Sequence, residues 1–551
     1  MAEDALEREE SLSQIPSYVK AIPTGREKGV FLAVDLGGTN CRVCSVNLHG
    51  DGTYSLVQTK YPIPRPLTVN PSYKPLFRFI AEKIRDFLEE HPESDIHDGS
   101  PNTNGSHLRR EDFQKLGFTF SFTYEQHSLA KGSVMFWDKG WDIPEALGRD
   151  PCEMLQEGLD ELRVPVLVVA LANDSVGTLL TRTYTSSKGG TSVRTTTTIG
   201  AIFGTGTNAA YVEKLENVKR LHHRADFQTR QPEDLMVINT EWGCFGDGQD
   251  GLLPSTEYDE ILDAASPHPR QEMTEKRISG LYLGELLRLI VVRLADENLF
   301  SMSLHPESPV YQRDGIECSL LSNIAGDDSN DCLQAIGYIT DTFRAANVSV
   351  DDACAIQVIS KAIARRAARL AGVALAAIVV QCGQRRESPP MTSSSLLSSK
   401  TDTARVDQKP ILETKASSSR STYKNGFSAM CRRFRAFVYG VVRSLGLGWL
   451  LRPAMAAKKN SGAPAVISPK PQLSSSATMT NDGDDVGAIE VGVDGSLIEF
   501  YPKFEQEMRE AVRDVLGPDY DEKRLRIGMA KDGSGVGAAL VALAATMQNE
   551  T

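Results

Sequence analysis

The sequence lacks the features of a membrane, secreted or nucleic-acid-binding protein. None of its apolar runs reaches the roughly 18 uninterrupted residues of a membrane-spanning helix. Residues 1–22 are acidic, without the apolar stretch of a secretion signal or the Arg-rich, acid-poor composition of a transit peptide. The net charge of −12 argues against a nucleic-acid surface. We therefore expect a cytoplasmic protein with no nucleic-acid partner.

Cysteine is also sparse, and its spacing favours neither a disulfide framework nor a zinc site. The nine cysteines form no repeated Cys-x-x-Cys pairs, and no His follows them at a zinc spacing. We predict free thiols in a reducing compartment and assign no metal ligands. Cys41 and Cys44 fall inside a predicted strand, where alternation favours packing over redox chemistry.

What the sequence does contain is typical of a globular α/β protein. At 551 residues, with 41% apolar and 24% charged residues, the chain is long enough for two lobes. Apolar runs that end at turns predict strands, and amphipathic or Ala-rich stretches predict helices. The predicted strands are 30–35, 41–48, a third one after the turn at 49–52, 116–122, 165–172, 196–206 with its Gly-rich end, 489–493 and 525–528. The predicted helices are 5–22, 76–90, 280–299, 352–380, 503–516 and 536–547.

Composition changes sharply between residues 385 and 485. This stretch is rich in Ser, Thr, Pro and Lys, the profile of a disordered segment, and it interrupts one lobe. Within it, residues 430–452 mix large apolar side chains with five arginines. Such a segment suits a peripheral site on an anionic membrane, for example the mitochondrial surface, or a groove on a protein partner. The alternatives are a helix buried against the neighbouring domain and a segment with no role.

Three Gly-rich turns follow predicted strands and are suited to phosphate. The first runs from Asp35 to Asn40, where glycines let backbone N–H groups approach an anion and the Asp suits a hydrated Mg²⁺. The second is 204–208, and the third, 531–537, leads into a helix whose first amides can hold an anion. Alone, the first turn is equally compatible with a plain hairpin. Together, the turns favour a nucleotide held from both lobes.

Acidic residues supply candidates for catalysis and for binding hydroxyl groups. Asp174 follows Asn173 at the end of a predicted buried strand, where an Asp can act as the general base of phosphoryl transfer. The alternative is that this pair caps the following helix. Glu241 and Glu275 are suited to accept hydrogen bonds from sugar hydroxyls, although each, taken singly, is also compatible with a solvated surface acid.

Taken in order, these motifs resemble the hexokinase family. The matching strings are LAVDLGGTN, LGFTFSF, WDKGWDI, LANDSVGTL, IFGTGTNAAYVEK, MVINTEWGCFG, ISGLYLGE, VGVDGS and DGSGVGAAL, between about residues 28 and 545. The resemblance implies an α/β, two-lobed actin-like ATPase (ribonuclease H-like) fold that binds ATP, Mg²⁺ and a hexose. On that basis the chain divides into an N-terminal helix (1–29), a small lobe (30–173), a large lobe (174–384), the insertion (385–485) and a last part (486–551) that completes the large lobe and returns a helix to the small one.

The resemblance also implies a role for each matching residue. Asp174 would take the proton from the sugar 6-hydroxyl, while Lys139 would bind the sugar and stabilise charge on the moving phosphoryl group. Sugar hydroxyls would meet Ser121, Asp138, Asn173, Asn208, Glu241 and Glu275. The phosphate and Mg²⁺ side would comprise Asp35, Gly37, Gly38, Thr39, Asn40, Arg42 and Thr205, and the adenosine side Gly533, Ser534 and Gly535.

Four features depart from the family pattern. Asp138 stands where the Trp-Thr-Lys-Gly motif has Thr, Thr123 replaces a Pro, residues 268–272 are His-Pro-Arg-Gln-Glu in place of Asn-Pro-Gly-Gln-Gln, and the insertion enters the nucleotide-side lobe. An Asp138–Lys139 pair would draw the amine from the sugar, and a misplaced catalytic contact costs on the order of 100-fold in rate. Two functions remain open: an ATP-dependent hexose 6-phosphotransferase, and a hexokinase-like sugar-sensing regulator with weak or no kinase activity.

Overall fold

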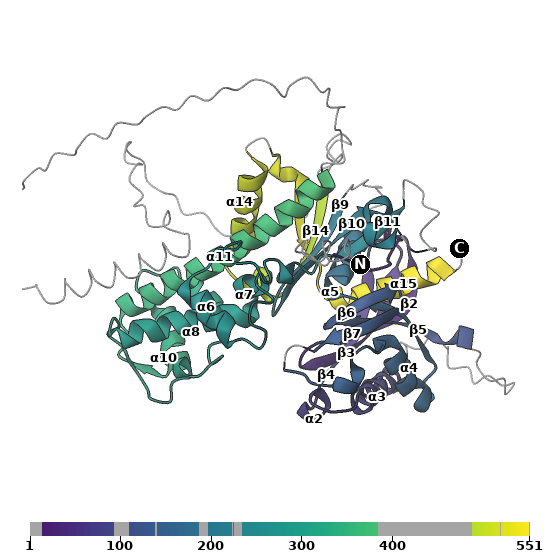
Figure 1. Ribbon diagram of the computed structural model, residues 1–551, viewed down its shortest axis with the longest axis horizontal. Coiled ribbons are helices and arrows are strands. Elements are labelled where there is room, and N and C mark those ends of the chain that lie inside the picture. Colours follow the sequence, from purple (N-terminus) through teal and green to yellow (C-terminus); the bar gives the residue numbers. More distant parts are fainter. Residues whose placement is uncertain are drawn as a thin grey trace, which may run out of the picture.

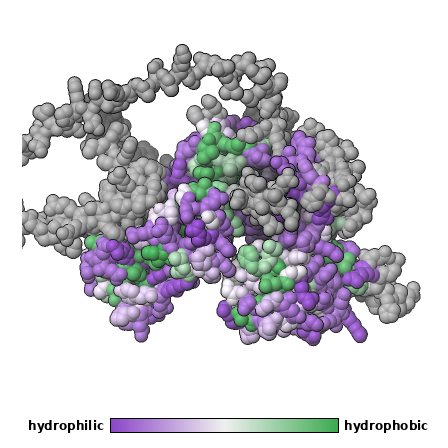
Figure 2. All heavy atoms as spheres, viewed as in Figure 1, coloured by the Kyte–Doolittle hydropathy of each residue, from purple (hydrophilic) through white to green (hydrophobic). Residues whose placement is uncertain are grey.

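Two β-sheets lie on either side of a pair of central helices, and a helical part extends from one of the sheets (Figure 1). The computed structural model describes residues 14–92, 110–137, 140–186, 197–222, 224, 234–383, 488–517 and 520–549. We call the five-stranded sheet and its helices the small lobe, and the six-stranded sheet with the helical part the large lobe. A space-filling view shows the molecule hollowed between the helical part and the small lobe (Figure 2).

The small-lobe sheet has the strand order β4-β3-β2-β5-β8. Strands β2, β3 and β4 form an antiparallel meander, whereas β5 and β8 run parallel to β2. Helices α3 and α4 cover one face of this sheet. The elements are β2 (Lys28–Leu36), β3 (Asn40–His49), β4 (Tyr54–Pro62), α2 (Arg65–Thr68), α3 (Lys74–Glu90), β5 (Gln114–Phe120), the hairpin β6 (Thr123–Ser128) and β7 (Lys131–Phe136), α4 (Pro151–Glu161) and β8 (Val166–Ala172).

The large-lobe sheet has the order β1-β11-β10-β9-β14-β15. Strands β9, β14 and β15 are parallel, and the remaining pairs are antiparallel. Its strands are β1 (Ile15–Pro16), β9 (Thr197–Phe203), β10 (Thr207–Lys214), β11 (Leu235–Asn239), β14 (Ile489–Asp494) and β15 (Leu525–Met529). Because β14 and β15 follow the insertion and pair with β9, the two sides of the insertion belong to one sheet.

The helical part of the large lobe packs around one long helix, α11. It comprises α6 (Glu257–Ala265), α7 (Glu275–Ile278), α8 (Gly280–Asp296), α9 (Ser319–Ala325), α10 (Leu333–Phe343), α11 (Val350–Gly383), α13 (Ser496–Phe500) and α14 (Phe504–Leu516), with a small sheet of β12 (Ser303–Leu304) and β13 (Ala345–Ala346). Single 3₁₀ turns occur at Arg110–Asp112, Pro144–Ala146, Leu215–Asn217, Lys219–Leu221, Trp242–Cys244, Pro309–Tyr311 and Glu522–Arg524. Among the described residues, no helix combines the length and apolar composition needed to cross a membrane.

Helices α5 (Asp174–Ser186) and α15 (Gly533–Asn549) lie between the two sheets and pack on each other. Helix α5 also packs on β9 and β14, and α15 on β2, β5 and β8. The helices cross at Gly177 and Gly537, where a Cβ on Gly537 would overlap the Cα atom of Gly177. The two glycines therefore allow a close crossing at the junction of the lobes.

The structure confirms most of the secondary structure predicted from the sequence. The predicted strands correspond to β2, β3, β4, β5, β8, β9, β14 and β15, and the predicted helices from residue 76 onward to α3, α8, α11, α14 and α15. Cys41 and Cys44 are buried on opposite faces of β3, with Cys41 among the α3 and α4 side chains and Cys44 among those of α15. Burial raises the pKa of the Cys44 thiol to about 12, which favours packing over redox chemistry.

The helix predicted over residues 5–22 is wrong in the part that the structure describes. Residues 15 and 16 form strand β1, in which Ile15 pairs with Asn239 and Pro16 with Ile238. The adjoining Ser17 donates its backbone N–H to the carbonyl oxygen of Val237. Pairing with the edge of a distant strand thus overrides the local helical pattern. The predicted insertion at 385–485, with its segment 430–452, lies outside the described residues.

Candidate active site

The predicted site residues of the small lobe follow the carboxyl ends of three neighbouring parallel strands. In the sheet register, Asp35 of β2 lies opposite Thr119 of β5, and Thr119 lies opposite Ala172 of β8. Ser121 and Asn173 come directly after these strands. The carboxyl edge of parallel strands is where α/β proteins bind ligands. The strand register therefore places the candidate phosphate-binding and sugar-binding residues of this lobe along one edge of the sheet.

The large-lobe sheet presents its candidates at the corresponding edge. The turn 204–206 follows β9, Asn208 lies at the start of β10, and Glu241 lies just beyond the end of β11. Gly495, after β14, lies against the turn, since a Cβ added to Gly204 would be 3.5 Å from the Cα atom of Gly495. The turn is held from behind by the start of α8, where the Gly280 N–H donates to the Gly204 oxygen at 2.8 Å.

Amide and carboxylate side chains among the predicted sugar-binding residues form a connected hydrogen-bond network. Asn208 donates from Nδ2 to Oδ1 of Asn239 at 2.8 Å, and Nδ2 also lies 3.4 Å from Oδ1 of Asn173 and from Oε1 of Glu241. Asn239 in turn donates from Nδ2 to Oε1 of Glu241 at 2.7 Å. Glu241 has a left-handed backbone with φ of 48°, which is uncommon for this residue type and concentrates at functional sites.

Glu275 occupies a slot formed by two glycines. It begins α7, and its Oε2 accepts a hydrogen bond from the N–H of Thr207 at 3.4 Å. A Cβ added to Gly206 would lie 3.2 Å from Oε1, and one added to Gly243 would lie 2.9 Å from Oε2. Any side chain at either glycine would therefore displace this carboxylate.

Asn173 and Asp174 have different roles at the start of α5. Oδ1 of Asn173 accepts hydrogen bonds from the N–H of Ser175 at 2.9 Å and from its hydroxyl at 2.6 Å. The predicted capping role is therefore filled by Asn173, while Asp174 is the first residue of α5 and half-buried. Oδ1 of Asp174 also accepts from the Ser175 N–H, at 2.8 Å. This bond fixes the carboxylate at the junction of the two sheets.

The negative charge that these carboxylates bring together contributes to raised pKa values of one buried and one half-buried neighbour, Tyr124 and Cys244. Burial, followed by the charges of Glu241, then Cys152 and then Asp174, raises the pKa of Tyr124 well above its usual value. Burial also raises the pKa of the Cys244 thiol, and the carboxylates of Glu241 and Glu275 add to the shift. Ionised carboxylates only accept hydrogen bonds. The site is therefore suited to an uncharged ligand that carries several hydroxyl donors.

On the phosphate side, Asp35 connects three elements. It is 5% exposed, and its Oδ2 lies 2.9 Å both from Nη2 of Arg42 on β3 and from Oγ of Ser534 at the start of α15. Oγ1 of Thr119 donates to the Ser534 carbonyl oxygen at 2.9 Å. Burial raises the pKa of Asp494, at the end of β14. Hydrogen bonds that its carboxylate accepts from the N–H groups of Gly495 and Gly533 act in the opposite direction but do not outweigh burial.

The turn between β2 and β3 is a compact backbone loop. The N–H of Gly37 donates to the Asn40 oxygen at 3.0 Å, and Nδ2 of Asn40 donates to Oγ1 of Thr39 at 2.7 Å. Trp141 holds the loop from outside by donating from Nε1 to the Gly38 oxygen at 2.8 Å. Thr205, in the facing lobe, is exposed. These backbone groups and the first turn of α15 suit the phosphates of a nucleotide.

The donor set around Asp35 also fits Mg²⁺ carried by a nucleotide. No group of three or more His, Cys, Asp or Glu side chains able to hold a metal occurs within the described ranges. Mg²⁺ in such sites keeps several waters and takes only one or two carboxylates together with substrate phosphates. A single buried carboxylate, Asp35, beside a phosphate loop is consistent with that mode of binding.

The structure thus brings together most of the predicted site residues, in two sets. The sugar-side set is Asn173, Asp174, Asn208, Glu241 and Glu275, with Ser121 after β5, where its N–H donates to the Leu36 oxygen at 3.2 Å. The phosphate-side set is Asp35, Gly37, Gly38, Thr39, Asn40 and Arg42 with Gly533, Ser534 and Gly535, whereas Thr205 follows β9 and accepts a hydrogen bond from the Leu281 N–H of α8. Asp138 and Lys139 lie outside the described residues.

Three residues near the site were not predicted from the sequence. Asn239 belongs to the hydrogen-bond network, and Trp137 and Trp141 pack beside the loops of the site. Asn239 links Asn208 to Glu241 by hydrogen bonds. Its position at a strand end, two residues before Glu241, is the sequence feature that could have identified it. Trp137 and Trp141 flank Asp138 and Lys139, and their rings stack with centroids 5.5 Å apart. Phe122 packs on Trp141 with centroids 4.5 Å apart. These aromatic contacts hold Trp137 and Trp141 together in the small lobe.

The two lobes face each other, and both carry acidic and amide side chains beside glycine turns. This arrangement is typical of a nucleotide-dependent sugar kinase of the actin-like type. Comparison with known proteins agrees. A family model described as Hexokinase matches residues 1–184, and a second one of the same description matches residues 198–406 and 467–544. The chain belongs to the hexokinase family.

Individual relatives match over nearly the whole chain. Glucokinase of Aspergillus niger is 37% identical, covering 98% of this chain and 90% of the relative. Hexokinase-2 of Schizosaccharomyces pombe is 31% identical with the same coverage. A solved structure of hexokinase from Schistosoma mansoni complexed with glucose has a TM-score of 0.67 and 28% identity, covering 98% of this chain and 90% of the other. These likenesses confirm the predicted two-lobed fold, and the family matches leave out residues 407–466.

Proposed function

We propose that this protein transfers the γ-phosphoryl group of ATP to the 6-hydroxyl of glucose or a related hexose. The observation that carries the proposal is the network of Asn173, Asn208, Asn239 and Glu241 beside Asp174. Relatives named glucokinase and hexokinase, and a similar structure complexed with glucose, support the substrate class. The same kinase relatives support ATP as the phosphoryl donor.

The residues divide the reaction into binding, deprotonation and charge stabilisation. The amides and the carboxylates of Glu241 and Glu275 hold the sugar hydroxyls, so that the 6-oxygen lies near Asp174. Asp174 accepts the hydroxyl proton as the oxygen bonds to the γ-phosphorus and the bond to the β–γ bridging oxygen breaks, releasing ADP. Arg42, Lys139 and the backbone of the Gly-rich turns stabilise the phosphate charge. Bound Mg²⁺ would neutralise further charge on the phosphates.

A coupled assay of purified protein with Mg-ATP and glucose, fructose or mannose tests the proposal. Turnover with at least one hexose supports it. Calorimetric hexose binding without turnover favours the sugar-sensing regulator, for which the motivating feature is Asp138 beside Lys139. In that case we expect Asp138→Thr to restore turnover by releasing Lys139 to the sugar.

We further propose a cytoplasmic location, which the eight free cysteines among the described residues support. Fluorescence microscopy of the tagged full chain tests it. A reticular or secreted signal would contradict the proposal.

A further inference from the structure

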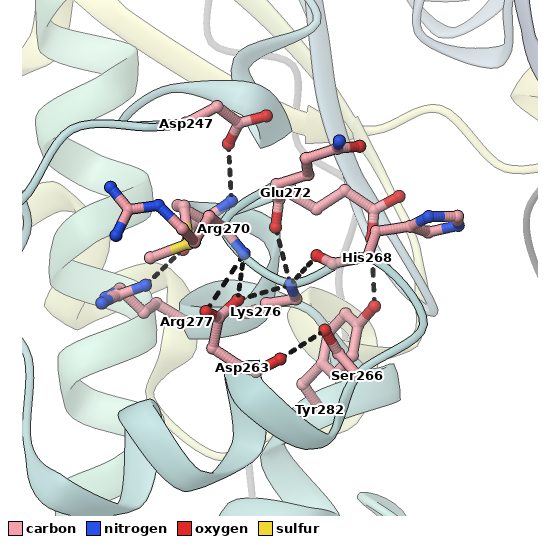
Figure 3. Close-up of polar contacts among 11 residues, drawn as sticks. Asp247, Asp263, Ser266, His268, Arg270, Glu272, Lys276, Arg277 and Tyr282 are labelled. Atoms are coloured by element: carbon pink, nitrogen blue, oxygen red, sulfur yellow. Dashed lines mark hydrogen bonds and ion pairs between the residues drawn. The ribbon is translucent and has the colours of Figure 1, made fainter.

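A buried lysine in the helical part of the large lobe has all of its donors paired. Nζ of Lys276 on α7 donates to Oδ1 of Asp263, to the His268 oxygen and to the Gln271 oxygen, each at 2.7 Å (Figure 3). The side chain is 2% exposed, and these three acceptors use all three protons of the ammonium group. Lys276 is therefore a structural brace with no proton left for a further acceptor.

A second buried contact in the same part joins two cysteine side chains. Sγ of Cys332 lies 3.1 Å from Sγ of Cys354, and both are free thiols. Cys332 comes directly before α10 and is 3% exposed, whereas Cys354 lies near the start of α11 and is half-buried. A disulfide bond has a sulfur–sulfur length of about 2.05 Å, so forming one here would bring the two atoms closer by about 1 Å. Unlike the lysine cluster, this pair can therefore still react.

The loop before α10 holds Cys332 against α11. Oδ2 of Asp327 accepts from the Ala335 N–H at 2.9 Å, which ties the loop to the first turn of α10. Nε2 of Gln357 on α11 donates to the Asp327 carbonyl oxygen at 2.6 Å. Gln357 lies three positions after Cys354, so it occupies the next turn of the same helix. Contacts that do not involve the thiols thus bring the two sulfur atoms together.

The surroundings give the two thiols different reactivity. Burial, followed by the hydrogen bond and charge of Cys354 and then the charge of Asp327, raises the pKa of the Cys332 thiol, and Lys361 opposes this shift. Cys332 therefore remains protonated at neutral pH. Cys354 has solvent exposure that Cys332 lacks, and Lys361 lies two turns further along α11. A soluble oxidant therefore meets the sulfur of Cys354 first.

Other thiols of the helical part are less suited to oxidation. Burial raises the pKa values of Cys318 and Cys382 to about 12. Thiols with so high a pKa are protonated at neutral pH and react slowly, since the thiolate is the nucleophile. In the part of the chain that the structure describes, Cys332 and Cys354 form the one hydrogen-bond contact between cysteine side chains.

We propose that Cys354 and Cys332 form a site of reversible oxidation by peroxides. The Cys354 thiolate attacks one oxygen of hydrogen peroxide and becomes a sulfenic acid, while the O–O bond breaks and the leaving hydroxide takes up a proton to form water. The Cys332 sulfur then attacks the Cys354 sulfur, and its proton leaves with the sulfenic hydroxyl as a second water. The two thiols have lost two electrons to the peroxide. The resulting disulfide joins α10 to α11 and is transient in a reducing compartment.

Peptide mapping of the oxidised full chain tests the site. The reduced protein is treated with hydrogen peroxide, its remaining thiols are blocked with N-ethylmaleimide, and unreduced peptides are analysed by mass spectrometry. We expect a linked Cys332–Cys354 peptide that dithiothreitol removes, while Cys318 and Cys382 are recovered as blocked thiols. Recovery of Cys332 and Cys354 as blocked thiols, or oxidation of Cys318 or Cys382 as fast as that of Cys354, would overturn the proposal.

Single variants separate the roles of the two thiols. Cys332→Ser should leave Cys354 as a sulfenic acid that dimedone labels, whereas Cys354→Ser should leave Cys332 as an unmodified thiol. Cys318→Ser is the matched control, because Cys318 is also half-buried in the helical part and its loss should leave the disulfide yield unchanged. Oxidation of Cys332 at the wild-type rate in the Cys354 variant would contradict the proposed order of steps.

Thermal unfolding measures what the disulfide does to the fold. Linking positions 332 and 354 restricts the unfolded chain, so peroxide should raise the Tm of the wild type by about 2–8 °C and leave that of Cys332→Ser unchanged. A Tm of the oxidised wild type equal to or below that of the reduced protein would contradict a stabilising link. Neither cysteine belongs to the candidate active site, so these results are independent of whether the chain phosphorylates hexose.

Discussion

Ser534 and Asp35 are 499 positions apart in the sequence, yet the Ser534 hydroxyl donates to Oδ2 of Asp35 at 2.9 Å. The same oxygen pairs with Arg42. The bond ties the first turn of the central helix α15 to the tip of β2, beside the phosphate loop. We therefore expect the proposed phosphate site to be assembled only when the C-terminal helix is docked on the small lobe.

Replacing Ser534 by Ala should weaken ATP binding. A hydrogen bond to a charged group contributes about 1.5–3 kcal/mol, so the KM for ATP should rise by about tenfold to a hundredfold with a smaller effect on the KM for glucose. Thr546→Ala is the matched control, since Thr546 lies on the same helix and only donates to backbone carbonyl groups within it. An unchanged KM for ATP in the Ser534 variant would contradict this role.

Replacing Gly243 by Ala should damage sugar binding. The new methyl group would lie 2.9 Å from Oε2 of Glu275 and displace the carboxylate from its slot. We expect the glucose KM to rise by at least about tenfold, because one misplaced contact can cost that much or more. Gly337→Ala on α10 is the control, since a Cβ there meets nothing within 4 Å. Equal glucose KM values for the two variants would argue against the slot.

The pair Asp259 and Arg366 should make stability depend on pH. Burial acts to raise the pKa of Asp259, but the charge and hydrogen bonds of Arg366, with the Thr256 hydroxyl, outweigh it, so that the pKa lies below its ordinary value. The pair therefore stabilises the fold above about pH 4, the unfolded pKa of Asp, and this stabilisation is lost as pH falls through the lower folded pKa.

Asp259→Asn tests the pair by urea unfolding at several pH values. Breaking a buried pair costs about 3–5 kcal/mol, so the variant should lose that much free energy of unfolding at pH 7 and less as pH falls below 4. Asp314→Asn, in an exposed pair with Arg313, should cost no more than about 1 kcal/mol. A loss that is the same at every pH would exclude the proposed linkage.

Local features were predictable from the sequence, whereas long-range ones were not. The strands ending at Asp35 and at the 204–206 turn follow from apolar runs that stop at glycines. The helix over 5–22 was wrong because β1 pairs with β11, more than two hundred positions away. The role of Asn239 in the network was not predicted from the sequence, because it depends on a hydrogen bond with Asn208, which lies on another strand. The slot around Glu275 likewise depends on how two distant glycines meet.

Removing residues 407–466 should leave folding and hexose phosphorylation intact, because the family matches bypass this stretch and long insertions cost little stability. Thermal unfolding and the coupled assay check this expectation. Loss of folding or of activity would show that the folded, active protein requires the segment. Co-sedimentation with anionic vesicles then decides between the alternatives for residues 430–452. Binding that disappears with the deletion supports a membrane role, and binding that persists contradicts it.

We propose Asp174 as the base that deprotonates the hexose. The direct test compares kcat from the coupled assay with the glucose Kd from calorimetry, for the wild-type chain and Asp174→Asn. We expect kcat to fall by at least about 100-fold, the usual loss on removing a general base, while Kd changes by only about threefold. Turnover close to that of the wild type, or a loss of glucose binding as large as the loss of rate, would contradict it.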